Sequence, residues 1–161
     1  IGLASKYFFQ TYPDSKVVAI EPDAGNFAMA KINNEKSNIC LCQAAISSEA
    51  GEGSLIDMGA ANAFRVTKVG EGLAFITVNS IFELNRGCHP LIKKIDIEGF
   101  ESDLFSENIE WIDRFTIIMI ELHEWMVPKS NNSMNFLKAI SGRDRDFIHH
   151  SGYVLSISNQ F

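Results

Sequence analysis

The sequence has no basic run and no apolar stretch long enough to cross a bilayer. Its 14 lysines and arginines are outnumbered by 20 aspartates and glutamates, for a formal net charge of -6. This balance argues against nucleic acid or an anionic membrane as a partner. The most apolar stretch, at 115–122, is far shorter than the roughly 18 residues of a membrane span. No secretory signal is recognised, so we expect a cytoplasmic protein without a membrane span.

Cysteine is also scarce, with three residues in the chain. Cys40 and Cys42 are two positions apart, which on a strand places both side chains on one face, where we expect small buried apolar residues. Cys88 stands beside His89, but a metal site would need further ligands. The thiols therefore indicate a reducing cytosol and no chemistry of their own.

What is present is the composition of an ordinary globular protein, 46% hydrophobic and 21% charged. That composition excludes a disordered or low-complexity chain. A length of 161 residues suits one domain, and we expect residues 1–161 to form it.

The apolar runs at 17–20, 39–46, 91–97 and 115–120 lack alternation, as buried parallel strands do. Helices are expected over 24–35, with Asp23 as the N-cap, and over 100–107 and 133–142, with a last strand at 153–157. This order predicts an α/β fold with a doubly wound parallel sheet. The glycine-rich segments at 51–53 and 70–72 predict turns in a small antiparallel excursion.

Acidic residues close several of the predicted strands. Ligands bind at the carboxyl ends of parallel strands, where a carboxylate such as Glu21 can accept hydrogen bonds from both ribose hydroxyls of a nucleoside. Lys94, Asp96 and Glu98 alternate with isoleucine and so share one strand face, which a buried strand would normally avoid. This run is the clearest indication of a site.

A second pair, Glu121 and His123, also shares one strand face and is expected beside Asp96 on the neighbouring strand. A histidine can take the proton of a hydroxyl group near neutral pH. Asp96, Glu98 and Glu101 could hold a divalent cation, but the sequence does not require one, and we predict no metal.

These blocks occur in one order along the chain: Glu21-Pro22-Asp23 with Asn26, then Ala44-Ala45, then the run from Lys94 to Glu101, then Glu121 and His123. Together they resemble the FkbM-type family of S-adenosylmethionine-dependent methyltransferases over nearly the whole chain. The resemblance implies a Rossmann-like class I methyltransferase sheet. It also implies O-methylation of a hydroxyl on a small-molecule or glycan acceptor, such as a sugar, a polyketide or a related metabolite.

The resemblance implies roles for individual residues. Glu21 would hold the ribose of S-adenosyl-L-methionine, and Asp96 would face its methionine end. The expected cofactor-binding residues are Gly2, Glu21, Pro22, Asp23, Asn26, Ala44, Ala45 and Asp96. Placing Glu98, Glu101 and His123 on the acceptor side is our own inference, in which His123 is the base and Glu121 or Glu98 orients it. The expected catalytic residues are His123, Asp96, Glu98 and Glu121.

One departure from the family pattern is expected at the N-terminus. The first strand and glycine loop of the family would precede residue 1, so the chain is expected to be a fragment whose sheet lacks a strand between those ending at Glu21 and Asp96. An open strand edge there would favour pairing with another chain, including a second copy. Cofactor affinity would then be weak or absent.

Two other interpretations stay open. A truncated or degenerate Rossmann-like fold could serve as a non-catalytic binding module. A nicotinamide-dependent reductase is disfavoured, because Tyr12 and Lys16 match a Tyr-x-x-x-Lys pair but stand just before a strand and include Pro13. Acceptor specificity is expected in the excursion at 51–78 and in 125–135. In the second segment we expect an apolar group that would either line an acceptor pocket or cover the edge of the sheet, namely Trp125, Met126, Val127 and Pro128.

Overall fold

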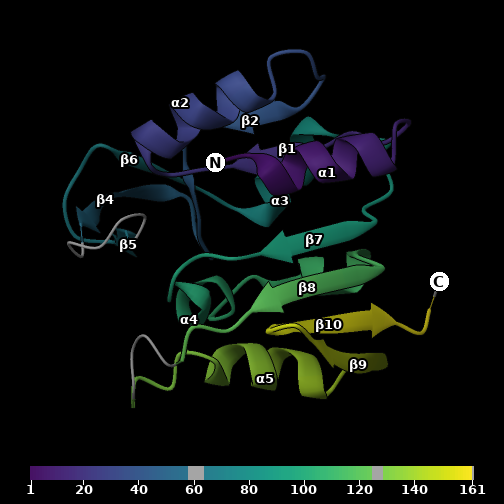
Figure 1. Cartoon of the computed structure of the whole chain (residues 1–161). Helices are drawn as coiled ribbons and strands as arrows, with labels where there is room; N and C mark the ends of the chain where they lie inside the picture. Colours follow the sequence, from purple (N-terminus) through teal and green to yellow (C-terminus); the bar gives the residue numbers. More distant parts are fainter. Residues whose placement is uncertain (58–63, 125–128, 161) are drawn as a thin grey trace.

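The computed structural model describes residues 1–57, 64–124 and 129–160. Figure 1 shows the order of the elements along the chain. They are α1 (Leu3–Thr11), β1 (Val18–Ile20), α2 (Ala24–Asn33), β2 (Cys40–Cys42), β3 (Ala45–Ile46), β4 (Gly51–Asp57), β5 (Phe64–Thr67), β6 (Leu73–Ile76), α3 (Val78–Leu84), β7 (Ile92–Ile95), α4 (Glu101–Leu104), a 3-10 helix (Ile109–Arg114), β8 (Ile117–Glu121), α5 (Met134–Ser141), β9 (Arg145–His150) and β10 (Tyr153–Ser158).

The strands form three separate sheets, so the prediction of a single parallel, Rossmann-like class I methyltransferase sheet is wrong. Strands β1 and β2 pair in parallel as a two-stranded sheet, and a second sheet has the order β7-β8-β10-β9. In that second sheet β7 and β8 are parallel, whereas β10 runs antiparallel to both of its neighbours. The apolar runs predicted strands but carried no information on which strands would pair.

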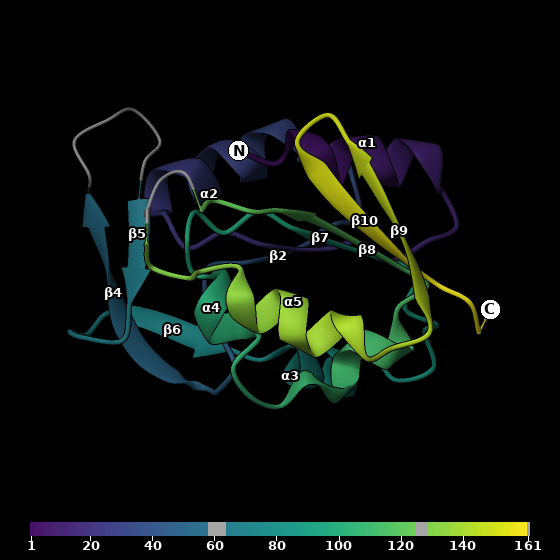
Figure 2. The ribbon, with the colours of Figure 1, turned by 90° about the horizontal axis from the view of Figure 1, so that it is seen from below.

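The third sheet, of order β3-β6-β4-β5, contains the predicted excursion. Its first strand comes from the apolar run at 39–46, which was expected as one strand but divides into β2 and β3 in different sheets. Strand β4 pairs β6 through its first three residues and β5 through its last four, so this sheet curls (Figure 2). Gly51 and Gly53 therefore lie within a strand rather than in the expected turn. Gly70 and Gly72 do lie in a turn, with φ of +101° and +95°.

The main core lies against one face of the second sheet. Ile95, Ile118 and Ile120 from β7 and β8 are buried there beneath the 3-10 helix and α5. Figure 2 shows α3, α4 and α5 on one side of the strands, with α1 and α2 on the other. Helix α2 begins as predicted, because the Asp23 carboxylate accepts a hydrogen bond of 2.7 Å from the backbone N–H of Asn26. Helix α1, in contrast, buries none of its residues.

Strands β1 and β7 belong to different sheets, yet residues of both line one cavity of about 1060 Å³. It lies between the strand that ends near Glu21 and the strand that ends near Asp96. This is the place where the family pattern has a further strand that we expected this chain to lack. Apolar residues of both strands contribute to its walls, among them Val18, Ile20 and Ile92.

Candidate functional site

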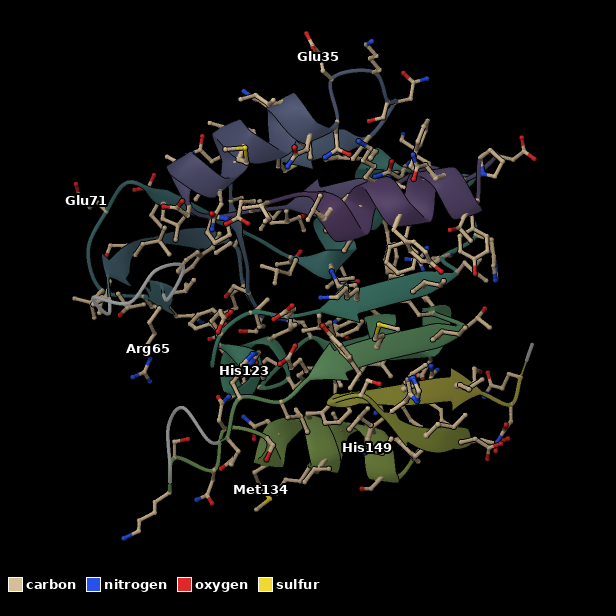
Figure 3. All side chains as sticks on the ribbon, in the orientation of Figure 1. Glu35, Arg65, Glu71, His123, Met134 and His149 are labelled. Carbon is tan, nitrogen blue, oxygen red and sulfur yellow. The ribbon has the colours of Figure 1, made fainter. Side chains whose placement is uncertain are left out.

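The site is built around His123, at the edge where β7 and β8 end. These strands run parallel with Ile95 opposite Ile120, so the residues that follow them emerge side by side. Nε2 of His123 lies 3.7 Å from Oδ1 of Asp96 and 3.7 Å from Oε2 of Glu98. We call Asp96, Glu98 and His123 the His123 centre; Figure 3 shows His123 at the end of β8. The expected proximity of Asp96 and His123 is thus present.

A buried carboxylate holds the imidazole in place. Nδ1 of His123 lies 2.6 Å from Oε1 of Glu101, which is fully buried at the start of α4, and His123 itself is only 3% exposed. The side-chain amide of Asn132 donates to the other Glu101 oxygen, and Asn132 Oδ1 accepts a hydrogen bond from the backbone N–H of Ser102. The carboxylate in contact with the imidazole ring is therefore Glu101, whereas Glu121 or Glu98 was expected to orient it.

Asn132 was missed by the sequence analysis. It stands in a polar segment between β8 and α5 that has the form of a glycosylation sequon, which gives no hint of burial. In the structure it is 4% exposed and hydrogen-bonded within the site. Its contact with Glu101 spans 31 positions of the sequence, so no local pattern could have indicated it.

The surroundings shift the pKa values of the site. The hydrogen bond from His123 to Glu101 raises the pKa of His123 above its ordinary value, against the opposing effect of burial, and the other carboxylates add to the rise. Burial raises the pKa of Glu98, and the negative charges of Asp96, Glu121 and Glu101 add to this, while His123 opposes it. Glu98 also has a left-handed backbone, with φ of +51°, which places its carboxylate in the turn after β7.

A lysine and a further carboxylate complete the surroundings of the His123 centre. The Lys94 ammonium lies 2.7 Å from Oδ2 of Asp96 and 5.1 Å from the ring centre of Tyr153. Oδ2 of Asp96 is therefore paired, whereas Oδ1 faces His123. Glu121 Oε1 lies 3.9 Å from Nε2 of His123. The carboxylates of Asp96, Glu98 and Glu121 thus all face this one nitrogen atom.

The residues expected to bind the cofactor gather at the cavity between β1 and β7. Seven of them line it, namely Gly2, Glu21, Pro22, Asp23, Asn26, Ala45 and Asp96, and Glu98 lines it as well. Ala44 is buried and is not among the residues that line the cavity. Asp96 and Glu98 thus belong both to the cavity wall and to the His123 centre.

A second polar group, not predicted from the sequence, surrounds Asp103 on α4. Its Oδ2 accepts hydrogen bonds from the Ser47 hydroxyl at 2.7 Å and from the Ser48 backbone N–H at 3.1 Å. Lys68 Nζ lies 2.5 Å from Oδ1. Burial alone would raise the pKa of Asp103, but the hydrogen bonds from Lys68, Ser47 and Ser48 lower it. We call these four residues the Asp103 cluster.

Several other expectations are corrected or fall outside the described residues. Cys40 is exposed and Cys42 only half-buried, because β2 is covered incompletely. His149 and His150 are exposed and lie on strand β9. The segment from Trp125 to Pro128 lies outside the residues that the structure describes.

The chain matches no family model, no curated protein and no solved structure. The resemblance to FkbM-type methyltransferases therefore remains a prediction from the residues. Within the described ranges, no helix is both long and apolar enough to cross a membrane.

Proposed function

We propose that this protein is an S-adenosylmethionine-dependent methyltransferase that acts on a hydroxyl group of a small-molecule or glycan acceptor. One observation carries the proposal. Residues expected to bind the cofactor come from distant parts of the sequence, yet seven of them line one cavity. That cavity reaches Asp96 and Glu98, which lie 3.7 Å from Nε2 of His123.

The cavity suits a nucleoside cofactor in size and chemistry. Its volume of about 1060 Å³ lies at the upper end of the range for small-molecule sites. Glu21 stands at the end of β1 and is partly buried, and its Oε1 already accepts a hydrogen bond of 3.1 Å from the backbone N–H of Asp23. This contact orients the carboxylate, whose remaining acceptor positions can take the ribose hydroxyls.

The bound cofactor would supply an electrophilic methyl group on sulfur. The work left to the protein is to position the acceptor hydroxyl and to remove its proton. Nε2 is the imidazole atom that Glu101 does not engage, and it faces Asp96 and Glu98. An acceptor hydroxyl placed there loses its proton to the His123 centre, while Glu101 and Asn132 keep the ring from rotating.

The alternative function is a non-catalytic binding module. The division of the strands into three sheets favours it, because the expected single sheet is absent among the described strands. The His123 centre argues against it, since a module without chemistry has no need to gather carboxylates around a buried imidazole.

Calorimetric titration with S-adenosylhomocysteine tests the proposal. We expect weak but saturable binding to the unmodified chain and about tenfold weaker binding to Glu21→Ala, because a charge-assisted pair of hydrogen bonds is lost. Glu35→Ala is the matched control, since Glu35 follows α2 and lies away from the cavity (Figure 3). Equal affinity of Glu21→Ala and the unmodified chain would remove the ribose assignment, and absence of binding would favour the non-catalytic module.

A further inference from the structure

The donor atoms of the His123 centre are spaced like the ligands of a metal ion. One oxygen each from Asp96 and Glu98 and one nitrogen of His123 all lie within 4.8 Å of one another. Nε2 is 3.7 Å from each carboxylate oxygen, which is beyond hydrogen-bond length. Donors held about 2.1 Å from a cation at tetrahedral angles are separated by about 3.4 Å. The two distances from Nε2, 3.7 Å each, are close to this value.

The orientation of His123 is the second, independent observation. Its side chain is 97% buried, and Nδ1 lies 2.6 Å from Oε1 of Glu101, so Nε2 is the ring atom that faces Asp96 and Glu98. Metal-ligating histidines commonly donate their other ring N–H to a carboxylate, which fixes the tautomer and makes the ligand nitrogen more basic. Asn132 in turn holds Glu101, so the imidazole is positioned from behind by two further side chains.

The distribution of charge also favours a cation. Asp96, Glu98, Glu101 and Glu121 all lie within 4 Å of the same imidazole ring. Lys94 offsets part of this negative charge, but it pairs with Oδ2 of Asp96 and leaves Oδ1 directed at His123. Like-charged carboxylates brought this close repel one another, and a divalent ion between them turns that repulsion into attraction.

We propose that Asp96, Glu98 and His123 bind a divalent transition-metal cation, with Mn²⁺ or Zn²⁺ preferred over Mg²⁺. An imidazole nitrogen among the donors favours these ions, because Mg²⁺ prefers a shell made of oxygen atoms. The set differs from the one weighed on sequence grounds, because Glu101 is committed to His123 and Asn132 and is not available to a cation.

The part played by the cation in catalysis rests on the proposed methyltransferase function, whereas its binding does not. With a cation bound, Nε2 of His123 would be a ligand, and the role of base assigned to His123 above would apply to the metal-free protein. A hydroxyl bound at the cation becomes more acidic. Glu121, the carboxylate 3.9 Å from Nε2 that is not part of the ligand set, would then be placed to accept the proton of that hydroxyl.

Metal binding is measured on the full chain with MnCl₂ and ZnCl₂ alone, by electron paramagnetic resonance and calorimetry, without cofactor or acceptor. We expect one saturable site, and at least about tenfold weaker binding to Asp96→Asn and to Glu98→Gln. Both carboxylates are partly exposed, so these variants are expected to fold. Glu107→Gln removes the same charge from an exposed position beyond α4 and should bind the metal as the unmodified chain does.

Two results would overturn the inference: no saturable binding of Mn²⁺ or Zn²⁺ up to about 1 mM, or undiminished binding by both carboxylate variants. Titration with S-adenosylhomocysteine on the same metal-free samples separates the two proposals. Metal binding without cofactor binding would leave the metal site standing and remove the methyltransferase, and the reverse result would remove only the metal site.

Discussion

Two groups of acidic side chains lie near the short helix α4, which carries Asp103 of one group and Glu101 behind the other, and they are organised in opposite ways. In the Asp103 cluster both carboxylate oxygens have donors, from Ser47, Ser48 and Lys68. In the His123 centre Asp96 and Glu98 stand 3.7 Å from Nε2, too far for a hydrogen bond. Asp103 thus has protein donors on both oxygens. In the His123 centre Lys94 pairs with Oδ2 of Asp96, and the carboxylate oxygens that face Nε2 are the candidate ligand positions.

The largest effect is expected at the His123 centre. His123→Ala should lower the rate of methyl transfer about 10²-fold or more, because the group that activates the acceptor hydroxyl is lost. Affinity for S-adenosylhomocysteine should stay unchanged, since the cavity is lined by other residues. Transfer of a labelled methyl group to a panel of sugar and polyketide alcohols measures the first quantity, and calorimetry measures the second.

Two variants control this experiment. His123→Asn keeps an amide that can donate to Glu101, so it separates lost chemistry from lost folding. His149→Ala removes an exposed histidine on β9 and should leave the rate unchanged (Figure 3). A rate for His123→Ala within a few-fold of the unmodified protein would contradict the assignment.

The next largest effect is expected in the Asp103 cluster, and on stability rather than on activity. Asp103→Ala should lower the free energy of unfolding by about 2 kcal/mol, since it leaves the buried hydroxyls of Ser47 and Ser48 without their acceptor. Partial exposure of Lys68 limits the contribution of the ion pair. Urea unfolding followed by circular dichroism gives the value, and Glu107→Ala at an exposed position is the control. If Asp103→Ala lost methyl transfer but kept its stability, the Asp103 cluster would serve the reaction and not the fold.

The smallest effect is the pH dependence of that stability. The folded-state pKa of Asp103 is lowered from its ordinary value of 3.8. Its ionised form therefore stabilises the protein above that pH, and the contribution is lost as the pH falls through the lowered value. Between about pH 5 and pH 2 the unmodified protein should lose more unfolding free energy than Asp103→Asn does. If the unfolding free energies of the two proteins fell equally with pH over this range, Asp103 would not contribute to the pH dependence of stability.

The residues of the site were predictable because each marks the end of a local pattern. Asp96 follows one apolar strand and His123 closes another, and parallel neighbours bring such ends together. The partners of these residues were not predictable, because the contacts of His123 with Glu101 and of Glu101 with Asn132 span 22 and 31 positions. The same holds for Asp103 and Ser47, which are 56 positions apart.

Local sequence determined some boundaries, including the cap of α2 by Asp23 and the turn at Gly70 and Gly72. It also determined that acidic residues follow β1 and β7. Only the tertiary structure decided that the strands divide among three sheets and that Glu101 supports His123 from behind. The physical reason is that spacing along the chain dictates backbone conformation and the face of a side chain. Which edges pair, and which distant polar groups meet, depends on how the whole chain buries its apolar surface.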